Sequence, residues 1–544
     1  MRGLMMDVQL TLPAIERRAE TLFGAVQVVD RSADRSIHRY TYAAMIARAK
    51  RLAVALKKLG ATRGTRVATL GWNHHQHLEA YFAIPSLGAV LHTLNLRLHP
   101  DELTYILNDA GDEIVLVDQD MWPLYQKLQP TTVRHVILMG SGPGPERSYN
   151  ALSYEDLIAS AQESAFEWID IDERDAAALC YTSGTTGQAK GVLYSHRAIT
   201  FHCMNWAMVD NVAICRRDVV LGAPPMFHIN GWGLSFVSAM VGAKLVLPNR
   251  FLDPESVLDL IASERVTVAA GVPTVWLSVL DVLNTGRQRY DVRSLNRIAT
   301  GGSAPPTSMM RAWIEQYGVR IIHLWGMTEM TASGTVSLNA DDDSDGPSND
   351  ALYVCLARQG IPEPFIEIRA RDENGLIPWD GVTMGELEVR GPNVAAAYYG
   401  NGAAAETFTA DGWMRTGDIV TIAPSGSIAL CDRAKDLIKS GGEWISSVAL
   451  ENALMGHPAI AEAAVIAVPH PKWGERPVAC VVVKTGETVT ANVLKEHLAL
   501  TFAKWMLPDE FHFVDVIPRT STGKFLKASL RERFRHLYGK TTQQ

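Results

Sequence analysis

Between Tyr40 and Asp118, long amphipathic segments alternate with short apolar segments. The long segments have the spacing of helices, and the short ones have the length of buried strands. We expect helices at 42–59, 78–87 and 99–110, and strands at 66–71, 89–94 and 113–117. Helices that alternate with buried strands are typical of βαβ units, whose strands form a parallel sheet covered by helices. The pattern therefore predicts an α/β fold with a mostly parallel sheet.

The length and composition of the chain indicate a globular protein with several structural units. At 544 residues it exceeds the size of one ordinary core and allows about two to four units. Apolar residues make up 47% and charged residues 20%, the balance of a protein with packed cores and a polar surface. The longest apolar run, 266–280, is shorter than a membrane span of about 20 residues and is divided by Gly271 and Pro273. We therefore expect no transmembrane segment.

Charge, cysteine content and the first residues exclude other classes of protein. The net charge of −8 argues against a general nucleic-acid binder. The six cysteines form no C-x-x-C pair and show no metal-ligand spacing, so neither a disulfide framework nor a zinc site is indicated. The first ten residues contain Asp7 and Gln9 where a signal peptide needs an uninterrupted apolar core. We therefore expect a cytoplasmic protein that does not bind nucleic acid.

A loop rich in glycine and hydroxyl groups, YTSGTTGQAKG, starts at the end of the strand expected at 176–181. Gly184 and Gly187 allow a backbone approach that a Cβ atom would block, N–H groups in such a turn bind anions, and Lys190 adds a positive charge. The hydroxyl groups suit phosphate oxygens or hydrated magnesium and belong to Thr182, Ser183, Thr185 and Thr186. A Walker P-loop does not fit, because Gly191 follows the lysine. A solvated loop is the ordinary alternative to a phosphate-binding loop.

Further segments carry residues suited to binding a nucleotide or an acyl group, although each has an ordinary structural explanation when taken alone. In HLWGMTEM, an aromatic ring suits adenine and the carboxylate of Glu329 suits magnesium. In DGWMRTGDI, Asp418 has two acceptor oxygens, which suits a cis-diol. In CDRAKDLIKSGGEWIS, a glycine pair marks a domain junction, which predicts a strand end near Cys431 and a helix capped by Ser446 or Ser447. The others are PMFHINGWG, ATGGSAPP and PRTSTGKFLK.

In this order the segments resemble the motifs of the adenylate-forming enzymes, which include acyl-CoA synthetases, nonribosomal-peptide adenylation domains and beetle luciferases. The loop at 182–191 is similar to their T-S-G-T-T-G-x-P-K-G signature, with Ala189 in place of the usual proline. The residues of these motifs look most like those of bacterial medium- and long-chain fatty acyl-CoA synthetases, and they are also similar to those of methylthioalkanoate-CoA ligases. The resemblance implies a large N-terminal domain, 1–431, of parallel-sheet α/β subdomains plus a β-rich subdomain. A small mobile α+β domain, 432–544, would rotate about Asp432.

The resemblance also implies roles for individual residues. Lys524 matches the catalytic lysine, and Glu329 and Thr185 match residues that hold magnesium and assist catalysis. The implied nucleotide contacts are Thr182, Ser183, Gly184, Thr186, Gly187, Lys190, Gly302, Trp325, Thr328, Asp418, Arg433, Lys435 and Lys439. The implied acyl contacts are His228, Gly231, Trp232 and Gly301, with Trp232 as the gate.

The reaction implied by the resemblance has two steps. A carboxylate and ATP form an acyl-adenylate and pyrophosphate, and the CoA thiol then gives acyl-CoA and AMP. ATP, Mg²⁺ and CoA are therefore expected, and a homodimer is implied. A carrier-protein-loading adenylation enzyme and a luciferase-like oxygenase share the motifs and are the alternatives. The motifs do not encode acyl length, because one methylene changes binding by only about 1–3 kcal/mol.

Overall fold

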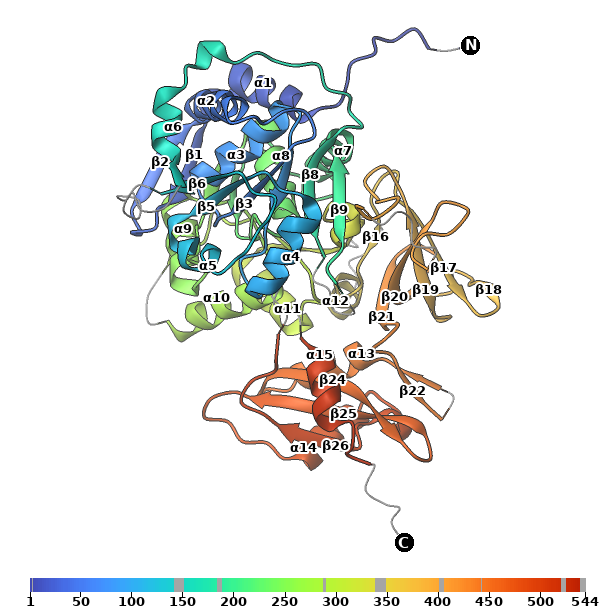
Figure 1. Cartoon of the computed structure of the whole chain (residues 1–544). Helices are drawn as coiled ribbons and strands as arrows, with labels where there is room; N and C mark the ends of the chain where they lie inside the picture. Colours follow the sequence, from blue (N-terminus) through green and yellow to red (C-terminus); the bar gives the residue numbers. More distant parts are fainter. Residues whose placement is uncertain are drawn as a thin grey trace.

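Four β-sheets organise the chain in the computed structural model (Figure 1). Two large sheets with mainly parallel strands and their helices occupy most of the sequence, and two smaller, mainly antiparallel sheets follow toward the C-terminus. This arrangement confirms the α/β fold class. The structure describes residues 1, 3–140, 151–182, 188–286, 290–337, 349–400, 406–441, 443–519 and 525–538.

The seven-stranded sheet contains the strands predicted from the alternating pattern, in the order β7-β6-β5-β3-β4-β8-β9. All neighbours are parallel except β8 and β9, which are antiparallel. Its strands are β3 (Arg66–Leu70), β4 (Val90–Thr93), β5 (Ile114–Asp118), β6 (His135–Met139), β7 (Ala151–Ser153), β8 (Ala176–Tyr181) and β9 (Gly191–Ser195). The three predicted helices form as α2 (Tyr42–Lys58), α3 (His75–Ser86) and α4 (Pro100–Ala110).

The nine-stranded sheet has the order β16-β15-β14-β13-β12-β10-β11-β1-β2. The strands from β14 to β1 in this order are parallel, whereas β2, β15 and β16 pair antiparallel at the edges. Its strands are β1 (Gln27–Arg31), β2 (Ile37–Thr41), β10 (Val219–Gly222), β11 (Lys244–Leu247), β12 (Val268–Gly271), β13 (Arg297–Gly301), β14 (Arg320–Trp325), β15 (Thr335–Val336) and β16 (Ile361–Pro362).

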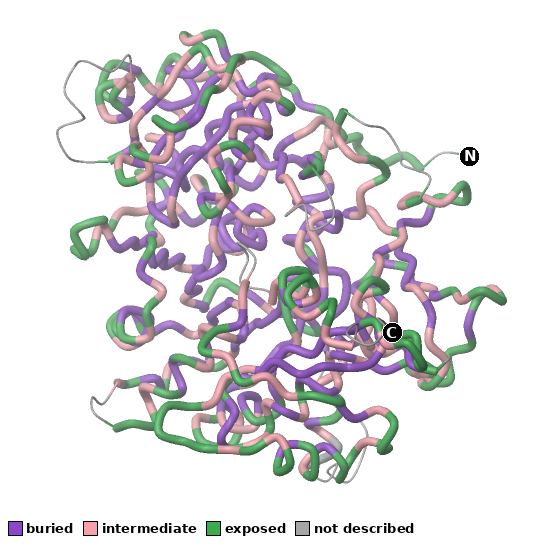
Figure 2. The backbone as a smooth tube through the Cα atoms, turned by 60° about the horizontal axis from the view of Figure 1, so that its bottom comes forward, coloured by how far each residue is buried: buried purple, intermediate pink, exposed green. Residues whose placement is uncertain are grey.

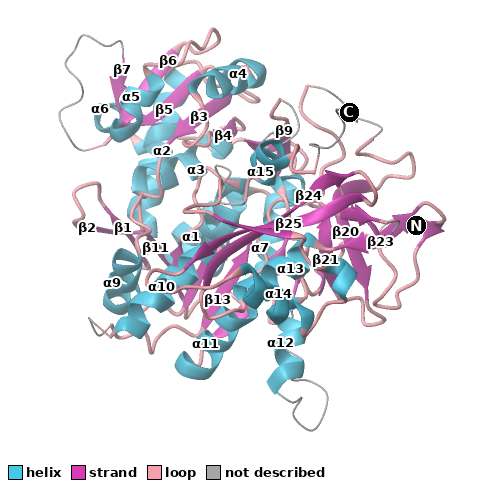
Figure 3. Ribbon diagram, turned by 90° about the horizontal axis from the view of Figure 1, so that it is seen from below, coloured by secondary structure: helices cyan, strands magenta, loops and turns pink. Residues whose placement is uncertain are grey.

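The remaining sheets are five-stranded and lie late in the sequence. The antiparallel third sheet contains β17 (Glu367–Asp372), β18 (Gly375–Leu376), β19 (Gly385–Arg390), β20 (Met414–Ile422) and β21 (Ile428–Arg433). The fourth sheet contains β22 (Ile438–Ser440), β23 (Glu443–Ile445), β24 (Ile460–His470), β25 (Gly474–Val483) and β26 (Glu510–Phe513). Figure 3 shows β24 and β25 of this sheet close to α13 (Ser447–Met455) and α14 (Ala491–Ala499).

The other helices surround the two large sheets or follow the fourth sheet. They are α1 (Leu12–Phe23), α5 (Trp122–Tyr125), α6 (Tyr154–Ser160), α7 (His196–Ala207), α8 (Leu234–Val241), α9 (Pro254–Glu264), α10 (Pro273–Thr285), α11 (Thr307–Tyr317), α12 (Asn349–Ala357) and α15 (Lys527–Phe534). Short 3₁₀ segments are η1 (Gln119–Met121), η2 (Glu163–Ala165), η3 (Ile229–Gly233), η4 (Thr328–Met330) and η6 (Lys504–Met506). None of the described helices has the length and apolar character that a membrane span requires.

The two large sheets share one hydrophobic core, and the fourth sheet has a separate one. Figure 2 shows buried residues mainly in the interior of the molecule and exposed residues mainly along its outside. Leu91 of β4 and Leu245 of β11 are fully buried in the shared core. The other face of the nine-stranded sheet packs on α10 and α11 through Trp276 and Trp313. Burying a large apolar side chain contributes about 1.5–3 kcal/mol, so the shared core joins the two large sheets firmly.

The segment around the predicted hinge agrees with expectation at its start and differs after it. The strand predicted to end near Cys431 is β21, which ends at Arg433. A hairpin of β22 and β23 then follows, in which the buried side chains of Ile438 and Ile445 lie opposite each other. The apolar pairs Leu437–Ile438 and Trp444–Ile445 are too short to show the alternating pattern that reveals a strand. Ser446 does cap α13, as predicted, because its hydroxyl accepts the Ala449 N–H at 3.1 Å.

Candidate active site

The two ends of the glycine-rich loop are held together by the β8–β9 hairpin. Tyr181 pairs with Gly191 at the end of the hairpin. Beyond this pair, the Thr182 N–H donates to the Lys190 carbonyl at 2.9 Å, and the Lys190 N–H donates to Thr182 Oγ1 at 3.2 Å. The predicted phosphate-binding residues Ser183, Gly184, Thr185, Thr186 and Gly187 lie outside the described residues. The hairpin therefore fixes where the loop leaves the sheet and where it returns.

Lys190 and Glu329 both contact the side chain of Tyr398. The Lys190 ammonium lies 4.7 Å from the centre of the Tyr398 ring, and the Tyr398 hydroxyl donates to Glu329 Oε1 at 2.8 Å. Burial, followed by the negative charge of Glu329, raises the pKa of the Tyr398 phenol well above its usual value. The phenol therefore stays protonated and remains a donor to the carboxylate. Two predicted site residues more than a hundred positions apart are thus joined by one tyrosine.

Backbone contacts hold the Thr328–Glu329 turn against the same hairpin. The Tyr194 hydroxyl of β9 donates to the Thr328 carbonyl at 2.6 Å, and the Ala395 N–H donates to the Glu329 carbonyl at 2.7 Å. Gly326 is required just before this turn, because a Cβ atom there would lie 1.8 Å from the Ala332 carbonyl oxygen. The Glu329 carboxylate is consequently placed by its backbone, and only 6% of the residue is exposed.

Trp325, Asp418 and Arg433 form a second group at the boundary between β14 and the third sheet. The Trp325 indole N–H donates to Asp418 Oδ2 at 3.0 Å, and Arg433 Nε lies 2.8 Å from Asp418 Oδ1. Asp418 and Arg433 are also opposite each other in the β20–β21 ladder. The Asp418 carboxylate is buried, with 1% of its side chain exposed, and the guanidinium compensates its charge. Three predicted nucleotide-binding residues therefore lie in mutual contact.

Asp432 connects β21 to the first helix of the C-terminal part. Its carboxylate accepts the N–H of Arg433 at 2.8 Å and the N–H of Ser447, the first residue of α13, at 2.7 Å. Burial raises the pKa of this carboxyl, and the positive charge of Lys527 opposes that rise. The predicted pivot is thus a hydrogen-bonded residue that links the third sheet to α13.

Lys435 and Lys439 are the other residues of this segment for which the resemblance implies nucleotide contacts. Burial lowers the pKa of the Lys435 ammonium. The Lys439 ammonium lies 5.0 Å from the centre of the Trp444 ring, across the β22–β23 hairpin. The nucleotide contacts of both lysines stay predictions.

The predicted acyl segment contains a left-handed turn after β10. Backbone φ angles are positive from Ile229 to Gly233, with 59° at Gly231 and 55° at Trp232. Positive φ is costly for a tryptophan, so the surrounding contacts must hold it. The Trp232 side chain packs into the shared core, with 7% of the residue exposed, and its carbonyl lies 3.1 Å from His202 Nε2. The turn places the predicted gate inside the protein.

Gly301 at the end of β13 and Gly302 directly after it are each required by the backbone for a different reason. A Cβ atom at Gly301 would lie 2.6 Å from the carbonyl oxygen of Leu324 in the adjacent strand β14. Gly302 has a φ of 84°, a conformation that side-chain-bearing residues rarely adopt. Both glycines therefore have a structural reason, and their predicted ligand contacts stay predictions.

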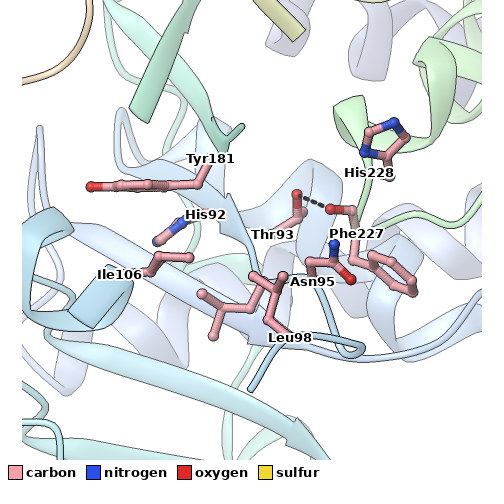
Figure 4. Close-up of a pocket in the computed structure, with 9 residues that line it drawn as sticks. His92, Thr93, Asn95, Leu98, Ile106, Tyr181, Phe227 and His228 are labelled. Carbon is pink, nitrogen blue, oxygen red and sulfur yellow. Dashed lines mark hydrogen bonds between the residues drawn. The ribbon is translucent and has the colours of Figure 1, made fainter. Parts of the chain in front are cut away.

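His228 lies in a pocket beside the start of the glycine-rich loop (Figure 4). Thr93 Oγ1 donates to the Phe227 carbonyl at 3.4 Å and ties β4 to the segment that carries His228. Tyr181, which immediately precedes the loop, lines the same pocket. The complete lining consists of His92, Thr93, Leu94, Asn95, Leu98, Ile106, Tyr181, Phe227 and His228. His228 of the predicted acyl segment and Tyr181, which precedes the predicted phosphate loop, therefore border one cavity.

Lys524 lies outside the described residues, but the residues on either side of it are ordered by contacts. Arg519 and Phe525 form an antiparallel bridge, and the Leu526 N–H donates to the Pro518 carbonyl at 2.7 Å. Arg519 Nη2 also donates to Glu462 Oε1 at 2.6 Å. The described residues before and after Lys524 are consequently joined to each other, and Arg519 joins them to β24 of the fourth sheet.

Comparisons with known proteins agree over nearly the whole chain. Residues 15–399 match the AMP-binding enzyme family, and residues 449–524 match the AMP-binding enzyme C-terminal domain. The chain belongs to the AMP-binding enzyme family. It is an acid–thiol ligase of the AMP-forming type, with ATP and CoA as co-substrates, which confirms the resemblance and the predicted class of enzyme.

Three proteins to which this AMP-binding enzyme is similar differ in the acid that their names give. It is 46% identical to a long-chain-fatty-acid–CoA ligase of Thermus thermophilus, over 98% of the chain and 97% of the relative. It is 41% identical to a 3-methylmercaptopropionyl-CoA ligase of Ruegeria pomeroyi, over 98% of the chain and 99% of that relative. A solved structure of the anthranilate CoA ligase AuaEII with anthranoyl-AMP matches at 26% identity with a TM-score of 0.86, covering 99% of the chain and 100% of the structure.

Sequence reasoning about this AMP-binding enzyme missed Tyr398 and Tyr194. Tyr194 stands in the GVLYSHR stretch directly after the glycine-rich loop, so its place in a strand beside the loop was a usable signal. Tyr398 lies far along the chain from Lys190 and Glu329, the residues it contacts. No local spacing connects it to either of them, and only the tertiary structure reveals the contact.

Proposed function

We propose that this ligase activates a medium- or long-chain fatty acid, first to the acyl-adenylate and then to acyl-CoA. The observation that carries the choice of acid is the 46% identity to a long-chain-fatty-acid–CoA ligase over nearly the full length of both proteins. The pocket that His228 shares with Tyr181 supports it, because the acid must meet the α-phosphate at the loop that follows Tyr181. The same reasoning makes the pocket in Figure 4 part of the path between acid and ATP.

The first half-reaction brings a carboxylate against a phosphate, so positive charge is needed between two anions. We assign this role to Lys190 at the loop and to Lys524 in the C-terminal part. A magnesium ion would add a further positive charge on the phosphates, and carboxylate and hydroxyl oxygens are ligands that it prefers. Glu329 and Thr185 would hold it. The Glu329 side chain suits this task, because Tyr398 orients it through one oxygen and Lys190 lies across the Tyr398 ring.

The nucleoside would be held by the second group of contacts. The Asp418 carboxylate, oriented by Trp325 and Arg433, would accept both ribose hydroxyls, because it has two acceptor oxygens in fixed positions. Thr328 and Gly302 would lie along the adenine and phosphates. We further propose that residues 432–544 form a domain that turns about Asp432 between the two half-reactions, because β21 ends at Arg433 and β22 already belongs to the fourth sheet.

A second candidate acid is 3-methylthiopropionate. The observation in its favour is the 41% identity to the Ruegeria pomeroyi ligase over 98% of this chain. That acid has a short thioether tail, whereas a fatty acid of medium or long length needs a deep apolar channel. Catalytic residues do not separate the two, because both acids react through the same carboxylate.

An assay of acid-dependent AMP formation tests the proposal. We would compare straight-chain acids from four to eighteen carbons with 3-methylthiopropionate, each with and without CoA. The proposal expects the highest kcat/KM between eight and eighteen carbons and AMP release that depends on CoA. A preference for 3-methylthiopropionate would select the second candidate. AMP release that does not respond to CoA would favour a carrier-loading or oxygenase chemistry instead.

Trp232→Ala is expected to change the ranking of acids by chain length and to leave the ATP requirement intact. The buried indole fills space beside the predicted acyl path, so its removal opens volume for longer tails. The measurement is kcat/KM for each acid, with Trp232→Phe as the control that keeps an aromatic ring. An unchanged length profile in a folded Trp232→Ala variant would make the indole an ordinary packing residue.

Tyr398→Phe is expected to raise the magnesium concentration needed for half-maximal activity and to lower kcat/KM by about 10-fold. It removes a hydrogen bond to a charged group, which contributes about 1.5–3 kcal/mol. Tyr399→Phe is the matched control, because the Tyr399 hydroxyl donates at 3.3 Å to the Ala110 carbonyl instead. Pyrophosphate release measured over a magnesium series compares the two variants. If both variants behave alike, Tyr398 does not position Glu329.

A further inference from the structure

Asp30, His38 and His75 meet where the two large sheets adjoin, on elements that the proposed reaction does not use. Asp30 lies in β1, His38 in β2, and His75 is the first residue of α3. His38 Nδ1 is 2.8 Å from Asp30 Oδ1, and His75 Nδ1 is 3.1 Å from both oxygens of Asp30. In the described part of the chain, this is the one group of three or more His, Cys, Asp or Glu side chains with ligand atoms within 4.8 Å of one another.

The separations suit ligands around one metal ion. Two ligand atoms that are each about 2.1 Å from a metal lie about 3.0 Å apart at a ligand–metal–ligand angle of about 90° and about 3.4 Å apart at the tetrahedral angle that zinc prefers. The observed nitrogen–oxygen separations of 2.8 and 3.1 Å match the smaller angle, and a tetrahedral ion would require the side chains to move slightly apart. Two imidazole nitrogens with one carboxylate match the donor set of Zn²⁺, Fe²⁺, Co²⁺ or Ni²⁺. Mg²⁺ and Ca²⁺ prefer a shell of oxygen ligands and fit this set poorly.

Burial and charge also favour a cation at this place. None of the Asp30 side chain is exposed, and a buried carboxylate is costly unless its charge is compensated. The ring centres of His38 and His75 are only 4.2 Å apart, so two protonated imidazoles would repel each other. A divalent ion bound to both Nδ1 atoms would compensate the carboxylate without that repulsion. The His38 and His75 side chains are 36% and 21% exposed, which leaves a route from solvent.

We propose that Asp30, His38 and His75 form a binding site for a divalent transition-metal ion, of which zinc is the type. The ion would fasten the β1–β2 hairpin to the start of α3. Asn73, two residues before His75, already bridges this region, because its side-chain amide donates to the Gly222 and Pro224 carbonyls at 3.0 and 2.8 Å. The ion would add a second cross-link between the same sheets and so stabilise the N-terminal part. Its role is structural and separate from acyl-CoA formation.

Binding of Co²⁺ to the purified full-length protein tests this site. The protein is stripped with EDTA, dialysed, and titrated with Co²⁺ by calorimetry and by visible absorption, with excess Mg²⁺ present to occupy the proposed Glu329 site. We expect one equivalent of Co²⁺ to bind with a micromolar Kd. His38→Ala and His75→Ala should each weaken binding by at least about 10-fold. His99→Ala is the control, because His99 forms an exposed pair with Asp101 at 3.4 Å and should bind like wild type.

Thermal unfolding gives a second readout with Zn²⁺. One equivalent of Zn²⁺ should raise the Tm of the stripped wild type by about 2 °C or more, and it should not change the Tm of the His38→Ala/His75→Ala variant. Circular dichroism checks that each variant is folded, and His38→Asn and His75→Asn replace any variant that is not. A wild type that binds Co²⁺ with a Kd above 100 μM overturns the proposal. Histidine variants that bind like wild type overturn it equally.

Discussion

Glu329→Gln is expected to slow acyl-adenylate formation by about 10²- to 10³-fold while the protein remains folded. The substitution removes the negative charge proposed to hold magnesium but keeps the volume of the side chain. A glutamine oxygen can still accept from the Tyr398 hydroxyl, and the Ala395 N–H still donates to the backbone carbonyl at position 329. The folded state therefore loses little, whereas the charge balance around the phosphates changes. Pyrophosphate release and Tm, measured on the same preparations, compare the two effects.

A buried carboxylate at another place supplies the matched control for this substitution. Glu363 is 1% exposed, and its Oε1 accepts from the Ser333 hydroxyl at 2.7 Å. Glu363→Gln removes a charge of the same kind from a comparable environment, so it measures the general cost of such a change. If Glu329→Gln keeps wild-type activity, Glu329 does not belong to the site. If Glu329→Gln lowers Tm much further than Glu363→Gln does, and the loss of activity follows from that unfolding, the role of Glu329 is structural.

Sequence reasoning predicts the elements whose pattern is long and local. The amphipathic segment predicted at 42–59 is α2, because apolar residues recur on one helical face over several turns. The run predicted at 176–181 is β8 with the same bounds, because every residue in it is apolar or aromatic. Ser195 caps α7 by accepting from the Ala198 N–H at 3.1 Å, as a serine before a helical segment predicts. Each of these signals lies within the element or directly before it.

Short elements and long-range contacts could not be read in the same way. The β22–β23 hairpin depends on Ile438 and Ile445 facing the buried side of the fourth sheet. The sequence around these two isoleucines is too short to predict that arrangement. In the candidate site, motif spacing identified Glu329 and Asp418 but could not show what orients them. Tyr398 is such an orienting residue, and its contact with Glu329 forms only when the segment after the third sheet's β19 folds back onto η4.

The other large effect concerns Lys524 and rests on the proposed rotation of residues 432–544. If this lysine approaches the α-phosphate only while the acyl-adenylate forms, it stabilises the first transition state and not the second. The thiol reaction would then proceed after Lys524 has moved away about Asp432, whose carboxylate joins β21 to α13. A single substitution should therefore separate two reactions that share one active site.

Lys524→Ala is expected to lower acyl-adenylate formation from ATP by at least about 10²- to 10³-fold, because it removes a cation from between two anions. The same variant should convert supplied acyl-adenylate and CoA to thioester at close to the wild-type rate. Single-turnover assays of each half-reaction measure the two rates separately. Lys484→Ala is the control, because Lys484 is an exposed lysine directly after β25, and both of its rates should match wild type. Equal damage to both half-reactions in a folded Lys524→Ala variant would contradict domain rotation about Asp432, because Lys524 would then act in both transition states.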